Sequence, residues 1–191
     1  MGKGMPAIVI AACAACGGGS GGGSSGSASV SGTIGGQSMT PRDAISKVVN
    51  VGPDSAGFIL VTNADSTCAK LNAHQQPKNV QVLGIELGIQ GSSGAGAPPG
   101  PGIFPVYSST DARGVVGPVA IAAFASGDAT CNPSASFEAV TGGAVTLTRV
   151  DANGYAGTFD LTFSGGLGHV TGSFSTTQCA VLGTSVGGTC I

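Results

Sequence analysis

Apolar and hydroxyl-bearing residues alternate along three segments in the C-terminal third of the chain. The apolar positions are Val145, Leu147, Phe159, Leu161, Phe163, Val170 and Phe174, with Thr, Ser or Asp standing at most positions between them. Because successive side chains of a strand point to opposite faces, each segment would bury one apolar face and expose one polar face. Turn residues at 151–154 and 164–168 separate the segments, which predicts a meander of antiparallel strands. The similar tripeptides at 157–159 and 172–174 are then paired strands of one meander and not a repeat array.

Short runs rich in Val, Ile, Thr and Phe recur along the rest of the chain, bounded by Gly, Pro, Asn or Asp. Together with the meander they give these expected strands: Ser29–Ile34, Asp43–Val51, Gly57–Thr62, Asn79–Leu87, Gly102–Tyr107, Pro118–Ala125, Ala144–Val150, Tyr155–Phe163 and His169–Ser175. This spacing predicts an all-β fold, an antiparallel sandwich or barrel with a C-terminal meander and at most one short helix. The helix is expected around Asp65–His74, where Asp65 or Ser66 would cap it and Pro77 would prevent its continuation.

The first residues of the chain have the pattern of an export leader. Lys3 precedes an apolar run from Met5 to Ala15, which is shorter than the roughly 20 residues of a membrane-spanning helix. Small residues followed by cysteine resemble a bacterial lipobox, in which the thiol is acylated and the leader is cut just before it. Cys16 is the preferred lipid acceptor because it leaves the longer apolar core and precedes the glycines, and Cys13 is the alternative. A redox or metal pair at these cysteines is disfavoured, since no βαβ pattern and no second ligand pair accompany them.

The segment GGGSGGGSSG at 17–26 has no side chains that could form a core. Such a segment is a flexible spacer. The expected organisation is a signal peptide over residues 1–15, the lipid-acceptor cysteine with its Gly/Ser tether over 16–27, and a single β domain over 28–191. Glycine after the acylated cysteine suggests, by resemblance to Gram-negative lipoproteins, transport to the outer membrane, so the membrane is the expected partner through a fatty acyl chain such as palmitate.

The composition narrows the classes of partner. The chain of 191 residues carries 35 glycines, and its 7 Lys and Arg against 9 Asp and Glu are scattered rather than clustered. A nucleic-acid partner is therefore not expected, because phosphate binding needs a basic stripe. The apolar fraction of 41% is too high for a disordered body.

The cysteines beyond the leader are even in number: Cys68, Cys131, Cys179 and Cys190. In an exported chain this predicts two disulfides, and three connectivities are open. The preferred pairing is Cys68–Cys131 with Cys179–Cys190, because the second bond would pin the Gly-rich tail to the end of the last strand. A metal site that combines these cysteines with a histidine is disfavoured by their wide spacing.

Candidate catalytic residues are few. The only histidines are His74 and His169, and neither lies in a GxSxG elbow or near a catalytic-looking cysteine. Among the acids, Asp160 on an exposed strand face and Glu86 late in another strand are the two at interesting positions, and a solvated surface location is preferred for both. The sequence therefore assigns no catalytic residue, no metal ligand and no cofactor.

The segments SVSGTIGGQSMTPRDAIS, TCAKL and GAVTLTRVDANGYAGTFDLTFSGGLGHVTGSFSTTQC resemble those of uncharacterised bacterial outer-surface lipoproteins. The resemblance covers most of residues 29–180, and the chain departs from it in Cys13, the third residue before Cys16, and in the additional Cys190. It implies a lipid-anchored β domain and brings no activity. The expected role is a non-enzymatic module that binds a protein or envelope component, or that is structural; the alternative is an exported hydrolase.

Overall fold

The computed structural model describes residues 25–51, 54–91, 96–133, 138–182 and 188–191. The strands are β1 (Ser27–Gly32), β2 (Asp43–Val51), β3 (Asp54–Thr62), β4 (Gln75–Gln76), β5 (Gln81–Gln90), β6 (Gly96–Ala97), β7 (Gly102–Pro105), β8 (Gly117–Ser126), β9 (Glu138–Asp151), β10 (Gly154–Phe163), β11 (His169–Ser175), β12 (Thr177–Gln178) and β13 (Thr189–Cys190). The helical elements are α1 (Thr67–Asn72) and the 3-10 turn η1 (Ser164–Gly166). Cys13, Cys16 and most of the expected tether lie outside the described residues.

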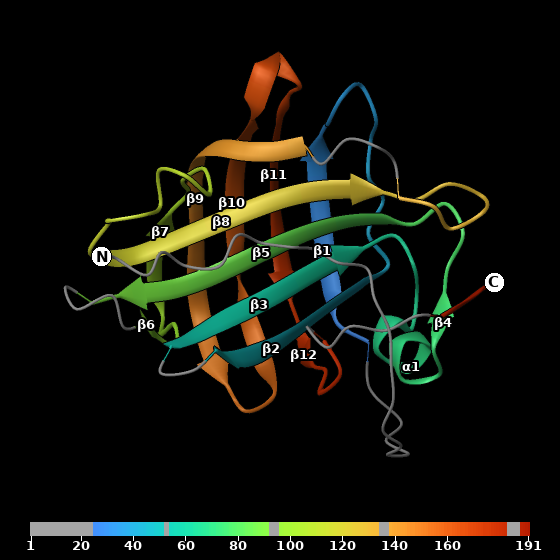
Figure 1. Cartoon of the computed structure of the whole chain (residues 1–191), viewed down its shortest axis with the longest axis horizontal. Helices are drawn as coiled ribbons and strands as arrows, with labels where there is room; N and C mark the ends of the chain where they lie inside the picture. Colours follow the sequence, from blue (N-terminus) through green and yellow to red (C-terminus); the bar gives the residue numbers. More distant parts are fainter. Residues whose placement is uncertain (1–24, 52–53, 92–95, 134–137, 183–187) are drawn as a thin grey trace.

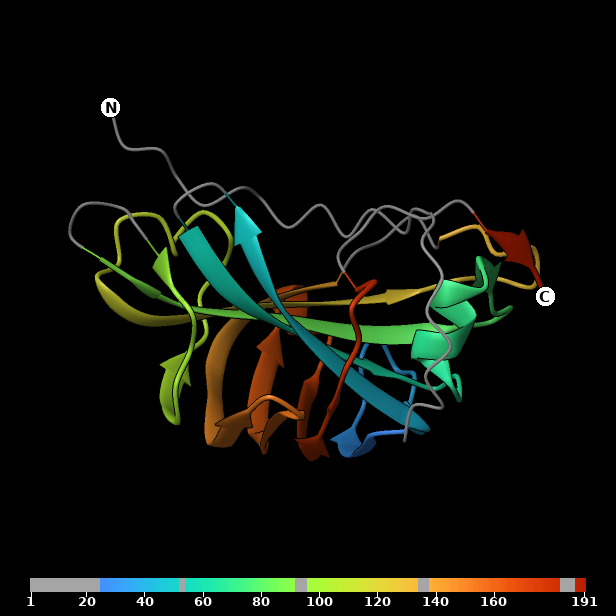
Figure 2. The ribbon, with the colours of Figure 1, turned by 90° about the horizontal axis from the view of Figure 1, so that it is seen from below.

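One mixed sheet forms nearly the whole body. Its strands follow the order β1-β11-β10-β9-β8-β5-β3-β2-β12, with β6 beside β5 and β7 beside β9, while β4 and β13 form a separate pair. The sheet is curled so that β2, β3, β5 and β8 cross over β9, β10, β11 and β1 at a steep angle (Figure 1). The same two layers are seen from another side in Figure 2. The all-β prediction is therefore confirmed.

Strand β9 joins the two layers. Its first residues pair with β8, at Ala139 with Ala123, and the rest of the strand pairs with β10. The main core lies between the layers and is formed by the inward-facing apolar positions of the strands, among them Ile59, Leu83, Ile85, Leu87, Val145, Leu147, Phe159, Leu161, Phe163 and Val170. The alternation in the sequence thus predicts correctly which side chains of the meander are buried.

The link from β11 to β12 ties the two layers together at one end. After β11 the chain leaves its own layer, and Thr177 pairs in parallel with Ile45 of β2. The Thr176 hydroxyl lies 2.7 Å from the Ser46 hydroxyl and accepts a hydrogen bond from the Tyr155 amide at 2.7 Å. This parallel pairing makes the sheet mixed, which the sequence does not predict because β12 is only two residues long.

The nine expected strands all overlap an observed strand, and β2 and β11 match residue for residue. The largest difference is β9, which begins at Glu138 rather than at Ala144 because its first residues continue onto β8. The two-residue strands β4, β6, β12 and β13 are not predicted, since runs of this length carry no periodicity.

Helix α1 forms inside the expected range, but neither expected residue caps it with its side chain. Ser66 occupies the N-cap position in a left-handed conformation and makes no side-chain cap bond, and Asp65 instead forms an ion pair with Lys70. The Thr67 amide donates to the Asp43 carboxylate at 2.7 Å. The carboxylate also accepts from the amides of Gly26 and Ala44, at 3.0 and 2.8 Å. A buried acid of β2 therefore caps the helix, and only the tertiary structure brings the two together.

The two Gly-x-Phe tripeptides of the meander pack against each other reciprocally. In the β10–β11 register, Gly157 is opposite Phe174 and Phe159 is opposite Gly172. A Cβ atom on Gly172 would lie 2.4 Å from the Phe159 ring, and one on Gly157 would lie 3.1 Å from the Phe174 ring. Each glycine thus leaves room for the aromatic ring of the neighbouring strand, and the two rings stack with centroids 6.4 Å apart.

Candidate functional site

The outer face of the β9–β10–β11–β1 layer is covered by short hydroxyl side chains. We call it the hydroxyl face, and it consists of Ser27, Ser29, Ser31, Thr146, Thr158, Thr162, Thr171, Ser173 and Ser175, with Asp160 and His169 among them. All are exposed except the half-buried Thr146. They lie in rows across the strands, as shown by the Ser29 and Ser173 hydroxyls, which are 2.9 Å apart. The face offers many hydrogen-bonding groups and little charge.

The structure brings together Asp160 and His169, which the sequence singled out separately. They lie on adjacent strands, and His169 Nε2 is 2.7 Å from Asp160 Oδ1. Both side chains are more than half exposed, at 53% and 62%. Within the described part of the chain no serine or threonine hydroxyl is bonded to the second nitrogen of His169. The pair therefore has two members of a catalytic triad on an open surface and lacks the nucleophile that a triad needs.

The predicted solvated position of Glu86 is wrong. Only 9% of this residue is exposed, although it lies on the outer face of its layer, where a solvated carboxylate is expected. Its neighbours in register are Phe58 of β3 and Ile121 of β8. Burial among such side chains raises the pKa of the Glu86 carboxyl to about 7. The outer face of this layer is partly apolar. The sequence does not predict this, because the residues that cover the face come from distant segments.

Two small apolar clusters pack on that outer face. One joins Ile45, Cys179 and Leu182 to partly buried residues of β3 and α1. The other contains Ala112, Val119 and Ile121. The first cluster covers the β2 end of the layer and the second the β8 end, so the C-terminal segment and the loop before β8 are part of the packed body.

The four cysteines form two disulfides, as expected, but the preferred pairing is wrong. Cys68 is bonded to Cys179, with Cα atoms 5.6 Å apart, and Cys131 is bonded to Cys190, with Cα atoms 5.8 Å apart. Cys179 comes directly after β12 and is buried beside α1, which carries Cys68. Cys190 is in β13, which pairs with β4. Cys179 and Cys190, which are nearest in sequence, are therefore not bonded to each other. Cys179 is bonded to α1, and Cys190 is bonded to the turn that contains Cys131.

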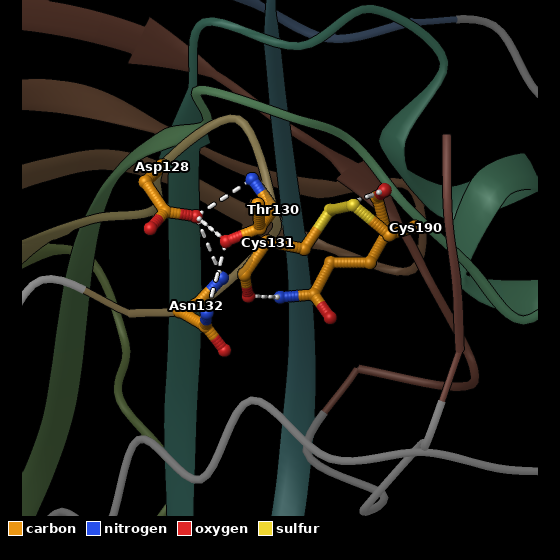
Figure 3. The surroundings of a disulfide bond; sticks show 6 residues. Asp128, Thr130, Cys131, Asn132 and Cys190 are labelled. Carbon is orange, nitrogen blue, oxygen red and sulfur yellow. Dashed lines mark hydrogen bonds between the residues drawn. A yellow bond between two sulfur atoms is a disulfide. The ribbon is translucent and has the colours of Figure 1, made fainter.

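A tight turn presents Cys131 to its partner (Figure 3). Asp128 Oδ1 accepts hydrogen bonds from the amides of Thr130 and Asn132, at 2.7 and 3.0 Å. Cys131 itself has a positive φ of 62°, and its carbonyl accepts a hydrogen bond from the Gln76 side chain at 3.0 Å. The Thr130 hydroxyl contributes most to lowering the pKa of Asp128, and the amide hydrogen bonds lower it further. The turn and β4 therefore hold this disulfide at a fixed position.

A polar hollow of about 480 Å³ lies at one end of the hydroxyl face. Its lining consists of Ser25, Gly26, Ser27, Arg149, Ala152, Asn153, Ser175, Thr176, Thr177 and Gln178. Arg149 is the one charged side chain in this described lining. Sequence reasoning counted this arginine among scattered charges, because nothing local to β9 indicates that β1 and β12 lie beside it.

The remaining candidates do not converge on a site. His74 follows α1, is half-buried, and its carbonyl accepts a hydrogen bond from the Thr189 amide. In the described ranges no group of three or more His, Cys, Asp or Glu side chains is placed to hold a metal ion. Over the same residues, none of the helices has both the length and the apolar character that crossing a membrane requires.

Comparisons with known protein families, with curated proteins and with solved structures found no match to this chain. The residues and their geometry are therefore the basis for assigning a function.

Proposed function

We propose that this protein is an exported lipoprotein whose β body is a non-enzymatic binding or structural module of the cell envelope. The observation that carries the proposal is the pair of disulfides in the body. Disulfides persist in oxidising compartments and are rare in the reducing cytosol. The bonds are compatible with export, and the amino-terminal sequence supplies the rest of the argument.

The leader pattern and the cysteine next to it support a lipid anchor. An apolar run of this length ends at Cys16, and glycines begin directly after it. The described body starts at Ser25, nine positions after that cysteine, and β1 begins at Ser27. A Gly/Ser segment between the two would hold the body away from the lipid surface. The glycine after the cysteine favours the outer membrane as the destination.

Palmitate labelling tests the anchor. Wild-type protein expressed in a Gram-negative host is expected to incorporate labelled palmitate and to fractionate with the outer membrane. Cys16→Ala is expected to lose the label, while Cys13→Ala keeps it. Label retained in Cys16→Ala and lost in Cys13→Ala would move the acceptor to Cys13. A wild-type protein without fatty acid, with an uncut amino terminus, would contradict the proposal.

A hydrolase is the second candidate, and the contact between His169 and Asp160 is what favours it. The exposure of both side chains argues against it, because acid–base groups work best where water is excluded. Esterase and glycosidase assays of wild type and His169→Ala separate the two functions. Activity that is present in the wild type and lost in His169→Ala would establish that the protein is a hydrolase. Equal rates in the two proteins would favour the non-enzymatic module.

A further inference from the structure

Three segments far apart in the sequence meet around the polar hollow. They are the chain leading into β1, the turn between β9 and β10, and the link from β11 to β12. In Figure 1 these segments come together at the lower edge of the molecule, where β9 and β10 turn and β12 lies beside β2. At this end of the sheet β12 crosses to β2 while β1 stays with β11, and the hollow lies among the segments that lead into and out of these strands.

Arg149 is held loosely in this hollow. Its Nη1 is 3.5 Å from Asp151 Oδ2, and its Nη2 is 3.4 Å from the Ser175 hydroxyl. Both distances exceed those of strong charge-assisted hydrogen bonds, which are about 2.7–2.9 Å. The buried Nε has no hydrogen-bond partner among the described residues. A guanidinium presents five donors in a planar fork. Because 42% of the Arg149 side chain is exposed, its Nη groups can be reached by a ligand from solvent.

The other lining groups suit the same kind of ligand. The hydroxyls of Ser25, Ser27, Ser175 and Thr177 and the side-chain amides of Asn153 and Gln178 line the hollow with the arginine, whereas the Thr176 hydroxyl is already bonded to Ser46 and Tyr155. No acidic side chain belongs to the described lining, and the nearest carboxylate on Arg149 is that of Asp151. Hydroxyls and amides can donate to oxygen atoms, and a guanidinium matches the two oxygens of a carboxylate or phosphate bidentately.

We propose that the hollow is a binding site for a small oxyanion, a carboxylate or phosphate group, with Arg149 as its cation. The proposal deepens the proposed binding role and rests on it, but the site itself does not require the lipid anchor. Ser25 follows Cys16 by nine positions, and an extended chain of that length spans about 30 Å. The oxyanion can therefore come from a lipid headgroup at the membrane surface or from a free solute.

Titration of the full exported chain, carrying Cys13→Ala and Cys16→Ala so that no acyl chain is attached, tests the site. Inorganic phosphate and acetate are added at low salt while the NMR signal of the Arg149 side-chain Nε–H is followed, with glucose as an uncharged control. Saturable shifts with either anion and none with glucose are expected. Absence of saturable shifts with both anions would overturn the proposal.

Two variants and a control locate the site. Arg149→Gln is expected to weaken anion binding by roughly tenfold or more, because it removes the charge and the fork. Asp151→Asn is expected to tighten binding, because it removes the carboxylate that competes for Arg149. The asparagine oxygen can still accept the hydrogen bond that the Asn153 backbone amide donates to Asp151 Oδ1 at 2.7 Å. Arg113→Gln, at an exposed loop arginine, is the matched control and should bind like the parent chain. Equal binding by Arg149→Gln and the parent would overturn the proposal.

Vesicle sedimentation distinguishes the two sources of the oxyanion. The chain that carries Cys13→Ala and Cys16→Ala is mixed with vesicles of phosphatidylcholine alone or with vesicles that also contain phosphatidylglycerol. Binding that needs phosphatidylglycerol and is lost in Arg149→Gln assigns the site to a lipid headgroup. Binding of free anions without any preference among vesicles assigns it to a solute. Failure of palmitate labelling in the wild type would remove the anchor but leave these titrations unchanged, so the two proposals fail separately.

Discussion

Glu86 is the residue whose surroundings differ most from what its position in the sequence indicates. It stands between the core residues Ile85 and Leu87. Because successive side chains of a strand point to opposite faces, Glu86 is expected to point outward into solvent. The structure places it between Phe58 and Ile121, nine-tenths buried. The physical consequence is a carboxyl group that is neutral over part of the physiological pH range.

The raised pKa of Glu86 predicts a stability that falls as pH rises. The folded state binds this proton up to about pH 7, whereas the unfolded chain releases it near the ordinary value of 4.5. The folded state therefore holds more protons between these values, and the free energy of unfolding decreases across this window by up to about 3 kcal/mol. Glu86→Gln, which stays neutral, is expected to stabilise the protein at pH 8 and to change little at pH 4.5.

Urea unfolding at the two pH values measures this effect. Glu138→Gln, at the chain's other glutamate, is the matched control and should shift the stability by a similar small amount at both. A Glu86→Gln profile parallel to that of the wild type from pH 4.5 to 8 would mean that the Glu86 carboxylate is solvated.

The β10–β11 pair shows how an element tolerates glycine inside a strand. Glycine in a strand interior is weakening by itself, because it adds chain entropy and no packing. Here the rings of Phe159 and Phe174 lie over the glycines of the opposite strand, so the apolar surface is restored by the neighbour. The same contact fixes the register, since a slip of one residue would turn every side chain to the other face.

Gly172→Val is expected to lower the free energy of unfolding by about 2 kcal/mol or more, because the new side chain overlaps the Phe159 ring and the Ser29 carbonyl. Thermal unfolding followed by circular dichroism measures the change. Ser173→Thr, at the next residue on the exposed face, is the control and should stay within about 0.5 kcal/mol. The losses of Gly172→Ala and Phe159→Leu should be less than additive in the double variant, because the smaller side chain relieves the contact with the ring although not the one with the Ser29 carbonyl; additive losses would contradict this packing of ring over glycine.

At the scale of the whole molecule, the disulfides fasten the C-terminal segment to the side of the body formed by β2, β3, β5 and β8. They close loops with sequence separations of 111 and 59 residues. One bond lies inside the apolar cluster beside α1, and the other joins the Asp128 turn to β13 (Figure 3). Without them, the described residues after β12 would be held by the packing of Val181 and Leu182 in that cluster and by the short pairing of β13 with β4.

Removing either bond is expected to cost about 2–4 kcal/mol. The double variant Cys68→Ala/Cys179→Ala should lose more than Cys131→Ala/Cys190→Ala, because the Cys68–Cys179 bond closes the longer loop and Cys179 is fully buried. Guanidinium unfolding of both variants checks the order, and peptide mapping without reductant checks the pairing. Peptides linking Cys68 to Cys131 would contradict the structure.

Local patterns in the sequence were enough to predict the strands, the meander and the participation of four cysteines in disulfides. The signals are alternation with a period of two, turn residues between the runs, and an even number of cysteines. The same local pattern placed Asp160 and His169 on the exposed face, where the structure has them.

Which distant segments meet emerged only once the chain was folded. The pairing of the cysteines, the cap that Asp43 gives to α1, the burial of Glu86 and the hollow around Arg149 all depend on contacts between residues far apart in the chain. Alternation specifies which side of a strand is apolar, but it does not specify what covers the other side or where the sheet curls. Those outcomes depend on packing the whole chain around one core.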